Sequence, residues 1–87
     1  MPIINKKIEV IALFNKNEPP KPIKLRITDE EGQLQVIKID SVLYSKRIKI
    51  ADKEFYKIIC KGYIQGLIKE LELRYYIKET VWVLYKI

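Results

Sequence analysis

Apolar and polar side chains alternate with a period of two over most of this chain, which predicts β-strands rather than helices. The alternation is clearest in Ile23–Thr28 and in Phe55–Tyr63. Lys7–Phe14 and Val81–Ile87 are apolar on both faces, so each should be covered on both sides. Asn15–Pro22 contains three prolines, which cannot donate a regular hydrogen-bond ladder, and is expected to be a loop.

The stretch from Glu54 to Ile87 predicts two hairpins in series. A two-residue turn at Gln65-Gly66 would place apolar residues opposite one another, pairing Tyr56 with Tyr75, Ile58 with Leu73, and Cys60 with Leu71. A four-residue loop over Tyr63–Gly66 would keep the same faces and move each partner by two. The residues expected to point inward in the second strand are Leu67, Leu71, Leu73, Tyr75 and Ile77. A helix over Leu67–Tyr76 is the alternative, because the segment is rich in helix formers.

The middle of the chain predicts two further strands, Leu34–Asp40 and Val42–Ile50. Apolar parity changes face at Val36-Ile37, which predicts a β-bulge there. In the second of these strands the pattern places Ile48 and Ile50 inward and Arg47 and Lys49 outward.

These elements predict a single all-β domain over residues 1–87, a small antiparallel barrel or a strongly bent meander of six to seven strands. A chain of this length holds one modest core. The two terminal strands could pair with each other and close the barrel, or a second copy of the chain could cover them.

Charge and composition leave two explanations open. The net charge is +6, which suits binding to a polyanion such as nucleic acid. The chain also holds 16 isoleucines and 14 lysines, a bias that an AT-rich genome or a thermophile would produce without any ligand. One cysteine and no long apolar segment lead us to expect a cytoplasmic protein with no membrane partner.

The side-chain chemistry argues against an enzyme. The chain has no histidine, which removes the commonest general base and metal ligand. One cysteine without histidine excludes the usual zinc sites, and the three glycines do not form a phosphate-binding loop. We therefore expect no catalytic residues, no metal and no cofactor.

A basic stretch, Lys46–Lys61, is the best candidate for function. Lysine, arginine and exposed tyrosine on a small β-surface can bind a single strand, since cations contact phosphates and rings stack on bases. One hairpin register places Lys57 opposite Arg74, a repulsive pair that an anion would relieve, and the other pairs Lys57 with Glu72. The candidate nucleic-acid-binding residues are Arg26, Arg47, Lys49, Lys57, Lys61, Tyr63, Arg74 and Tyr76.

A protein interface is the second hypothesis. Because the last strand is apolar on both faces, it could contact a second copy of the chain or a DNA-processing protein. The residues that would form this interface are Val81, Val83, Tyr85 and Ile87.

Short segments along the chain also resemble a known group of proteins. They are Ile8-Glu9-Val10, Pro22-Ile23-Lys24-Leu25-Arg26-Ile27, Val42-Leu43, Glu54-Phe55-Tyr56-Lys57-Ile58, Glu72-Leu73-Arg74-Tyr75 and the terminal Trp82-Val83-Leu84-Tyr85-Lys86-Ile87. In their order they resemble small uncharacterised bacterial domains found beside Y-family translesion DNA polymerases. This chain differs in having a single tryptophan and more lysine than arginine. The resemblance implies an accessory role near DNA repair or replication and assigns no site residue.

Overall fold

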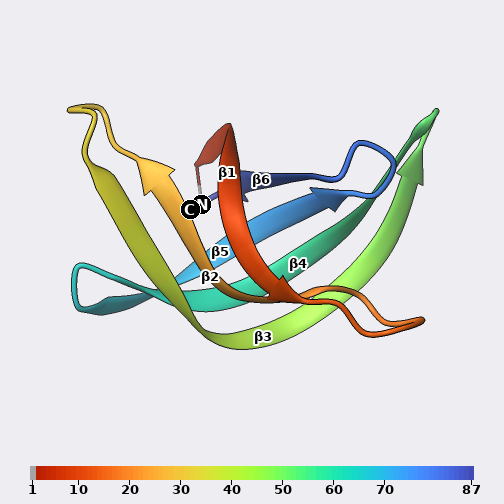
Figure 1. The fold of residues 1–87 in the computed structure, drawn as a ribbon, viewed down its shortest axis with the longest axis horizontal. Helices are drawn as coiled ribbons and strands as arrows, with labels where there is room; N and C mark the ends of the chain where they lie inside the picture. Colours follow the sequence, from red (N-terminus) through yellow and green to blue (C-terminus); the bar gives the residue numbers. More distant parts are fainter. Residues whose placement is uncertain (1) are drawn as a thin grey trace.

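Six antiparallel strands form a closed barrel in the computed structural model, which describes residues 2–87 (Figure 1). Each strand pairs with its neighbours in the sequence, and the last pairs with the first. The strands are β1 (Ile3–Leu13), β2 (Lys21–Thr28), β3 (Leu34–Ile50), β4 (Lys53–Ile64), β5 (Leu67–Tyr76) and β6 (Val81–Lys86). This confirms the predicted fold class. No helix in the described part of the chain is long and apolar enough to cross a membrane.

The two terminal strands close the barrel, as one of the two sequence hypotheses proposed. Ile8 of β1 lies opposite Trp82 of β6, and the Ile87 amide donates a hydrogen bond to the Pro2 carbonyl. Closure leaves neither terminal strand with a free edge, which removes the exposed backbone groups that invite pairing with other chains.

The first of the two closing hairpins, β4–β5, has the predicted register. Ile64 pairs with Leu67 across a two-residue turn, and both turn residues, Gln65 and Gly66, have positive φ. Positive φ at both central positions is the geometry of the type I′ turn that two-residue hairpins favour. The three apolar pairs predicted from the sequence are therefore present, and the helical alternative for Leu67–Tyr76 is wrong.

The core is formed by inward-facing residues of β2 to β6, and the partly buried side chains of β1 pack against it. Its fully or largely buried members are Leu25, Ile37, Ile58, Cys60, Leu71, Leu73, Trp82 and Leu84. Burial raises the pKa of the Cys60 thiol to about 12, so the thiol is protonated and unreactive at neutral pH.

One long bent strand, β3, replaces the two strands predicted between residues 34 and 50. The bulge expected at Val36-Ile37 is absent, since this part of β3 pairs regularly with β2. Leu34 and Val36 are simply apolar residues on the outer surface. The register instead shifts between Ile39 and Ser41 and again between Val42 and Tyr44.

The second shift reverses the faces expected for the end of β3. Arg47 lies opposite Tyr56, on the inward parity, and Ile48 lies opposite Phe55, on the outward parity. The prediction that Ile48 points inward and Arg47 outward is therefore wrong, because a bulge moves every later residue to the other face. Beyond the barrel body, this end of β3 and its partner β4 project as a hairpin (Figure 1).

Gly62 occupies a site where even a methyl group has no room. A Cβ built there would lie 2.8 Å from Ile37 Cγ2, 3.2 Å from Leu71 Cδ1 and 3.3 Å from the Lys38 carbonyl oxygen. Ile37 and Leu71 are both buried in the core and cannot easily move.

We expect Gly62→Ala to lower the free energy of unfolding by about 1–2 kcal/mol, because overpacking forces neighbours off their rotamers. Urea denaturation followed by fluorescence measures this. The control is Lys61→Ala, which places alanine at the exposed neighbouring position of the same strand. An equal loss of stability there would show that alanine in β4, and not crowding at Gly62, is the cause.

Candidate nucleic-acid interface

The outer face of β3 and β4 presents rows of cations. Residues directly opposite one another in a sheet share a face, so the register shows which side chains are neighbours. In one row Lys46 of β3 lies opposite Lys57 of β4, and Lys57 lies opposite Arg74 of β5. In a second row Lys24 of β2 lies opposite Lys38 of β3.

Two tyrosines lie among these cations. Tyr63 is directly opposite Lys38, and Tyr44 is opposite Ile59, between the two rows. Their exposed fractions are 44% and 50%, so both rings are available to solvent. We call this surface the basic strip; its members are Lys24, Lys38, Tyr44, Lys46, Lys57, Lys61, Tyr63 and Arg74.

Most lysines of the basic strip have no carboxylate partner. Within residues 2–87, Lys24, Lys38, Lys46 and Lys61 form no ion pair at 4.0 Å or less. The cross-strand neighbours Lys24 and Lys38, and likewise Lys46 and Lys57, therefore face each other as like charges. Such pairs destabilise a sheet unless an anion lies between them.

At the other end of the strip a buried carboxylate, that of Glu72, lies close to two of the cations. Glu72 is only 2% exposed, and its oxygens lie 3.1 Å from Arg74 Nε and 4.0 Å from Lys57 Nζ. The Arg74 guanidinium carbon lies 3.3 Å from the Tyr85 ring centroid and 4.7 Å from that of Phe55. These contacts give Arg74 one orientation and leave 20% of its side chain exposed. A guanidinium held in this way is a planar donor that can accept only a ligand of matching geometry.

Tyr63 is also fixed in place. Its hydroxyl donates a hydrogen bond of 2.9 Å to Asp40 Oδ1, from the bulged segment of β3. The hydrogen bond and the charge of Asp40 raise the pKa of Tyr63, so the phenol stays neutral at physiological pH. A neutral, oriented ring is a suitable surface for a base to stack on.

Half of the nucleic-acid-binding residues predicted from the sequence lie in the basic strip. These are Lys57, Lys61, Tyr63 and Arg74. The predicted repulsive register of Lys57 and Arg74 is present, and Glu72 also approaches Lys57. Lys61 lies opposite Ser41 on one side and Glu70 on the other.

The other four predicted residues lie elsewhere or are partnered. Arg26 lies beside the strip on β2, with Nη2 2.8 Å from each oxygen of Glu9. Tyr76 packs against Phe55, with ring centroids 5.1 Å apart. Arg47 and Lys49 are on the opposite face of the β3–β4 hairpin, where Arg47 pairs with Glu54 at 3.0 Å. That pairing lowers the pKa of Glu54, chiefly through the hydrogen bond from Arg47.

Four members of the strip are not among the binding residues named from the sequence, although Lys46 lies in the predicted basic stretch: Lys24, Lys38, Tyr44 and Lys46. Lys24 and Lys46 are basic residues of predicted strands, but only the register between strands shows that they oppose other cations. Lys38 and Tyr44 flank the two bulges of β3, where simple alternation does not identify the outer face.

The last strand is largely covered within the chain itself. Val83 is buried, while Val81, Tyr85 and Ile87 are half-buried. Arg74 covers the Tyr85 ring, and β1 and β5 occupy the two edges of β6. Packing within one chain thus accounts for much of the apolar character that suggested an interface here.

No group of three histidine, cysteine, aspartate or glutamate side chains among residues 2–87 is arranged to hold a metal ion. Comparison of the chain with protein-family models, with curated proteins and with solved structures finds no significant match. The function is therefore inferred from the geometry of the basic strip.

Proposed function

We propose that this protein is a non-enzymatic module that binds single-stranded nucleic acid along the basic strip. Its cations contact the phosphates, and Tyr44 and Tyr63 stack on bases. The observation that carries the proposal is the run of like-charged neighbours, Lys46–Lys57–Arg74 in one row and Lys24–Lys38 in another.

A lysine-rich composition alone accounts less well for this surface. A composition bias would scatter lysines over the surface without placing them directly opposite other cations. Ion pairing by itself does not distinguish the strip, because among residues 2–87 the lysines that form an ion pair at 4.0 Å or less are Lys53 and Lys57. On the strip, unpaired lysines lie next to one another beside two exposed rings. An extended polyanion would relieve this repulsion along its whole length.

The resemblance to domains beside Y-family DNA polymerases supports single-stranded DNA in repair or replication as the setting. In this proposal the protein works in the bacterial cytoplasm, where such DNA is found.

The test is the double variant Lys38→Gln/Lys46→Gln, which removes one cation from each row. Fluorescence anisotropy of a labelled thymidine oligonucleotide is measured over a range of salt concentrations. We expect the variant to bind about tenfold more weakly at low salt. Its slope of log affinity against log salt should be smaller by about 1.4, since each phosphate contact on a single strand contributes about 0.7.

A matched control removes the same charge elsewhere. Lys16 lies in the loop after β1, and Lys49 lies on the opposite face of the β3–β4 hairpin. Lys16→Gln/Lys49→Gln should retain most of the affinity. Equal losses in the two double variants would show diffuse attraction without a site, and no binding by the unmodified protein at low salt would refute the proposal altogether.

A further inference from the structure

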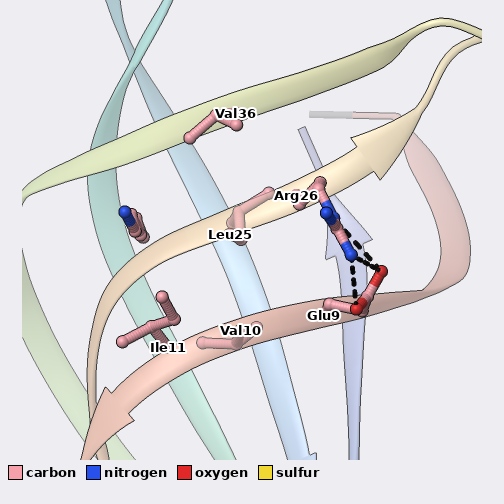
Figure 2. A pocket seen from close by; sticks show the side chains of 7 residues that line it. Glu9, Val10, Ile11, Leu25, Arg26 and Val36 are labelled. Atoms are coloured by element: carbon pink, nitrogen blue, oxygen red, sulfur yellow. Dashed lines mark hydrogen bonds and ion pairs between the residues drawn. The ribbon is translucent and has the colours of Figure 1, made fainter.

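A depression of about 380 Å³ lies on the outer surface where β1, β2 and the start of β3 meet (Figure 2). Ile11 of β1 and Val36 of β3 form two of its walls, and their exposed fractions are 56% and 57%. Leu25 and Val10 line its floor, where their backbones separate it from the core. At one end the ion pair of Arg26 and Glu9 closes it (Figure 2).

This depression is continuous with the basic strip. Lys24 lines it and is at the same time the cross-strand neighbour of Lys38. An anionic ligand that lies along the strip and extends past Lys24 would therefore also lie over the opening of the depression. The volume is at the small end of the range of about 300–1,000 Å³ that small-molecule sites occupy, and it suits a single planar ring system.

We propose that this depression receives one unstacked base of the bound single strand, while Lys24 contacts the adjoining phosphate. The inference rests on the proposed function and adds to it a preference for single strands. The aliphatic side chains Ile11 and Val36 pack against the base, and the Arg26–Glu9 pair offers hydrogen-bonding groups to its edge.

The depression makes the site selective against duplex. A base that is paired and stacked has to be flipped out of the helix before it can enter, which costs a few kcal/mol. The phosphates of a duplex can still contact the lysines of the strip. Duplex should therefore bind through charge alone, more weakly than a single strand.

The experiment uses a thymidine oligonucleotide that carries 2-aminopurine at one position, with the full-length protein. Binding should increase the fluorescence of 2-aminopurine, because the base leaves its stacked neighbours for an aliphatic site. The variant Ile11→Ser/Val36→Ser should lose most of this increase and bind the single strand about fivefold more weakly, with duplex binding unchanged.

Leu34→Ser is the matched control. Leu34 is an exposed apolar residue on the same face of β3, two residues from Val36 and outside the depression. It should retain both the fluorescence increase and the affinity.

If Ile11→Ser/Val36→Ser binds single strand like the unmodified protein, the base site is refuted while the strip stands. An acidic peptide with apolar side chains serves as a competitor. If it does not displace the oligonucleotide from the unmodified protein, the nucleic-acid assignment is supported. If the unmodified protein binds the peptide and Ile11→Ser/Val36→Ser does not, while both bind the oligonucleotide equally, the depression belongs to a protein partner. If no oligonucleotide binds at all, the proposed function fails first.

Discussion

Replacing Leu73 with alanine is expected to lower the free energy of unfolding by about 3 kcal/mol. Leu73 is fully buried at the centre of the barrel, opposite Ile58 on β4 and Leu84 on β6. Both neighbours are also fully buried, so the surroundings cannot collapse easily into the space that the truncation leaves. In a domain this small, such a loss is a large part of the total stability.

Leu67→Ala is the control for this measurement. Leu67 is the same residue type on the same strand, but 64% of its surface is exposed. Its truncation should change stability by less than about 0.5 kcal/mol in urea denaturation. A loss at Leu67 that matches the loss at Leu73 would mean that β5 responds as a whole to any shortened side chain, which would contradict burial as the cause.

These two leucines show what alternation can and cannot predict. The sequence predicts that both point inward, since both lie on the apolar parity of their strand. The parity is correct, but Leu67 is at the end of the hairpin, beyond the last layer of the core. Alternation of apolar and polar residues identifies the face of the sheet on which a residue lies. It does not show how far along a strand the core extends, because that depends on the packing of all six strands.

The bulges of β3 limited the prediction of the site in the same way. The β4–β5 hairpin is regular, so its register and the outward positions of Lys57 and Arg74 could be predicted from the sequence. Two bulges lie earlier in the chain, and each adds one residue that no apolar pattern marks. The faces of Arg47 and Lys49 were therefore predicted wrongly, and Lys46, although it lies in the predicted basic stretch, was not named as a binding residue.

Glu72 connects the stability of the barrel with the charge of the basic strip. It is the one carboxylate that approaches both Arg74 and Lys57, and it is buried on the outer side of β5 beneath them. Without it, the row Lys46–Lys57–Arg74 would hold three like charges with no compensation. Stability and ligand binding should therefore respond to this residue in opposite directions.

Glu72→Gln should accordingly lower the free energy of unfolding by about 2 kcal/mol, because it leaves Arg74 and Lys57 without their anion. The expected loss of stability is smaller than the loss caused by breaking a fully buried ion pair, since the two cations are partly exposed to solvent. The same variant should bind a thymidine oligonucleotide severalfold more tightly at low salt, because the strip carries one more positive charge. The oligonucleotide should also raise the melting temperature of the variant more than that of the unmodified protein, since the phosphates take the place of the missing carboxylate.

Urea denaturation and anisotropy on the same samples separate these effects, with Glu70→Gln as the matched control. Glu70 is exposed on the same face of β5, opposite Lys61, so its change alters the charge equally without opening a buried pair. Glu70→Gln should tighten binding by a similar factor at unchanged stability, because the change in charge is the same. Weaker binding by Glu72→Gln would contradict this expectation and would show instead that Glu72 orients Arg74 toward phosphate, because the loss of a fixed geometry would then outweigh the gain in charge.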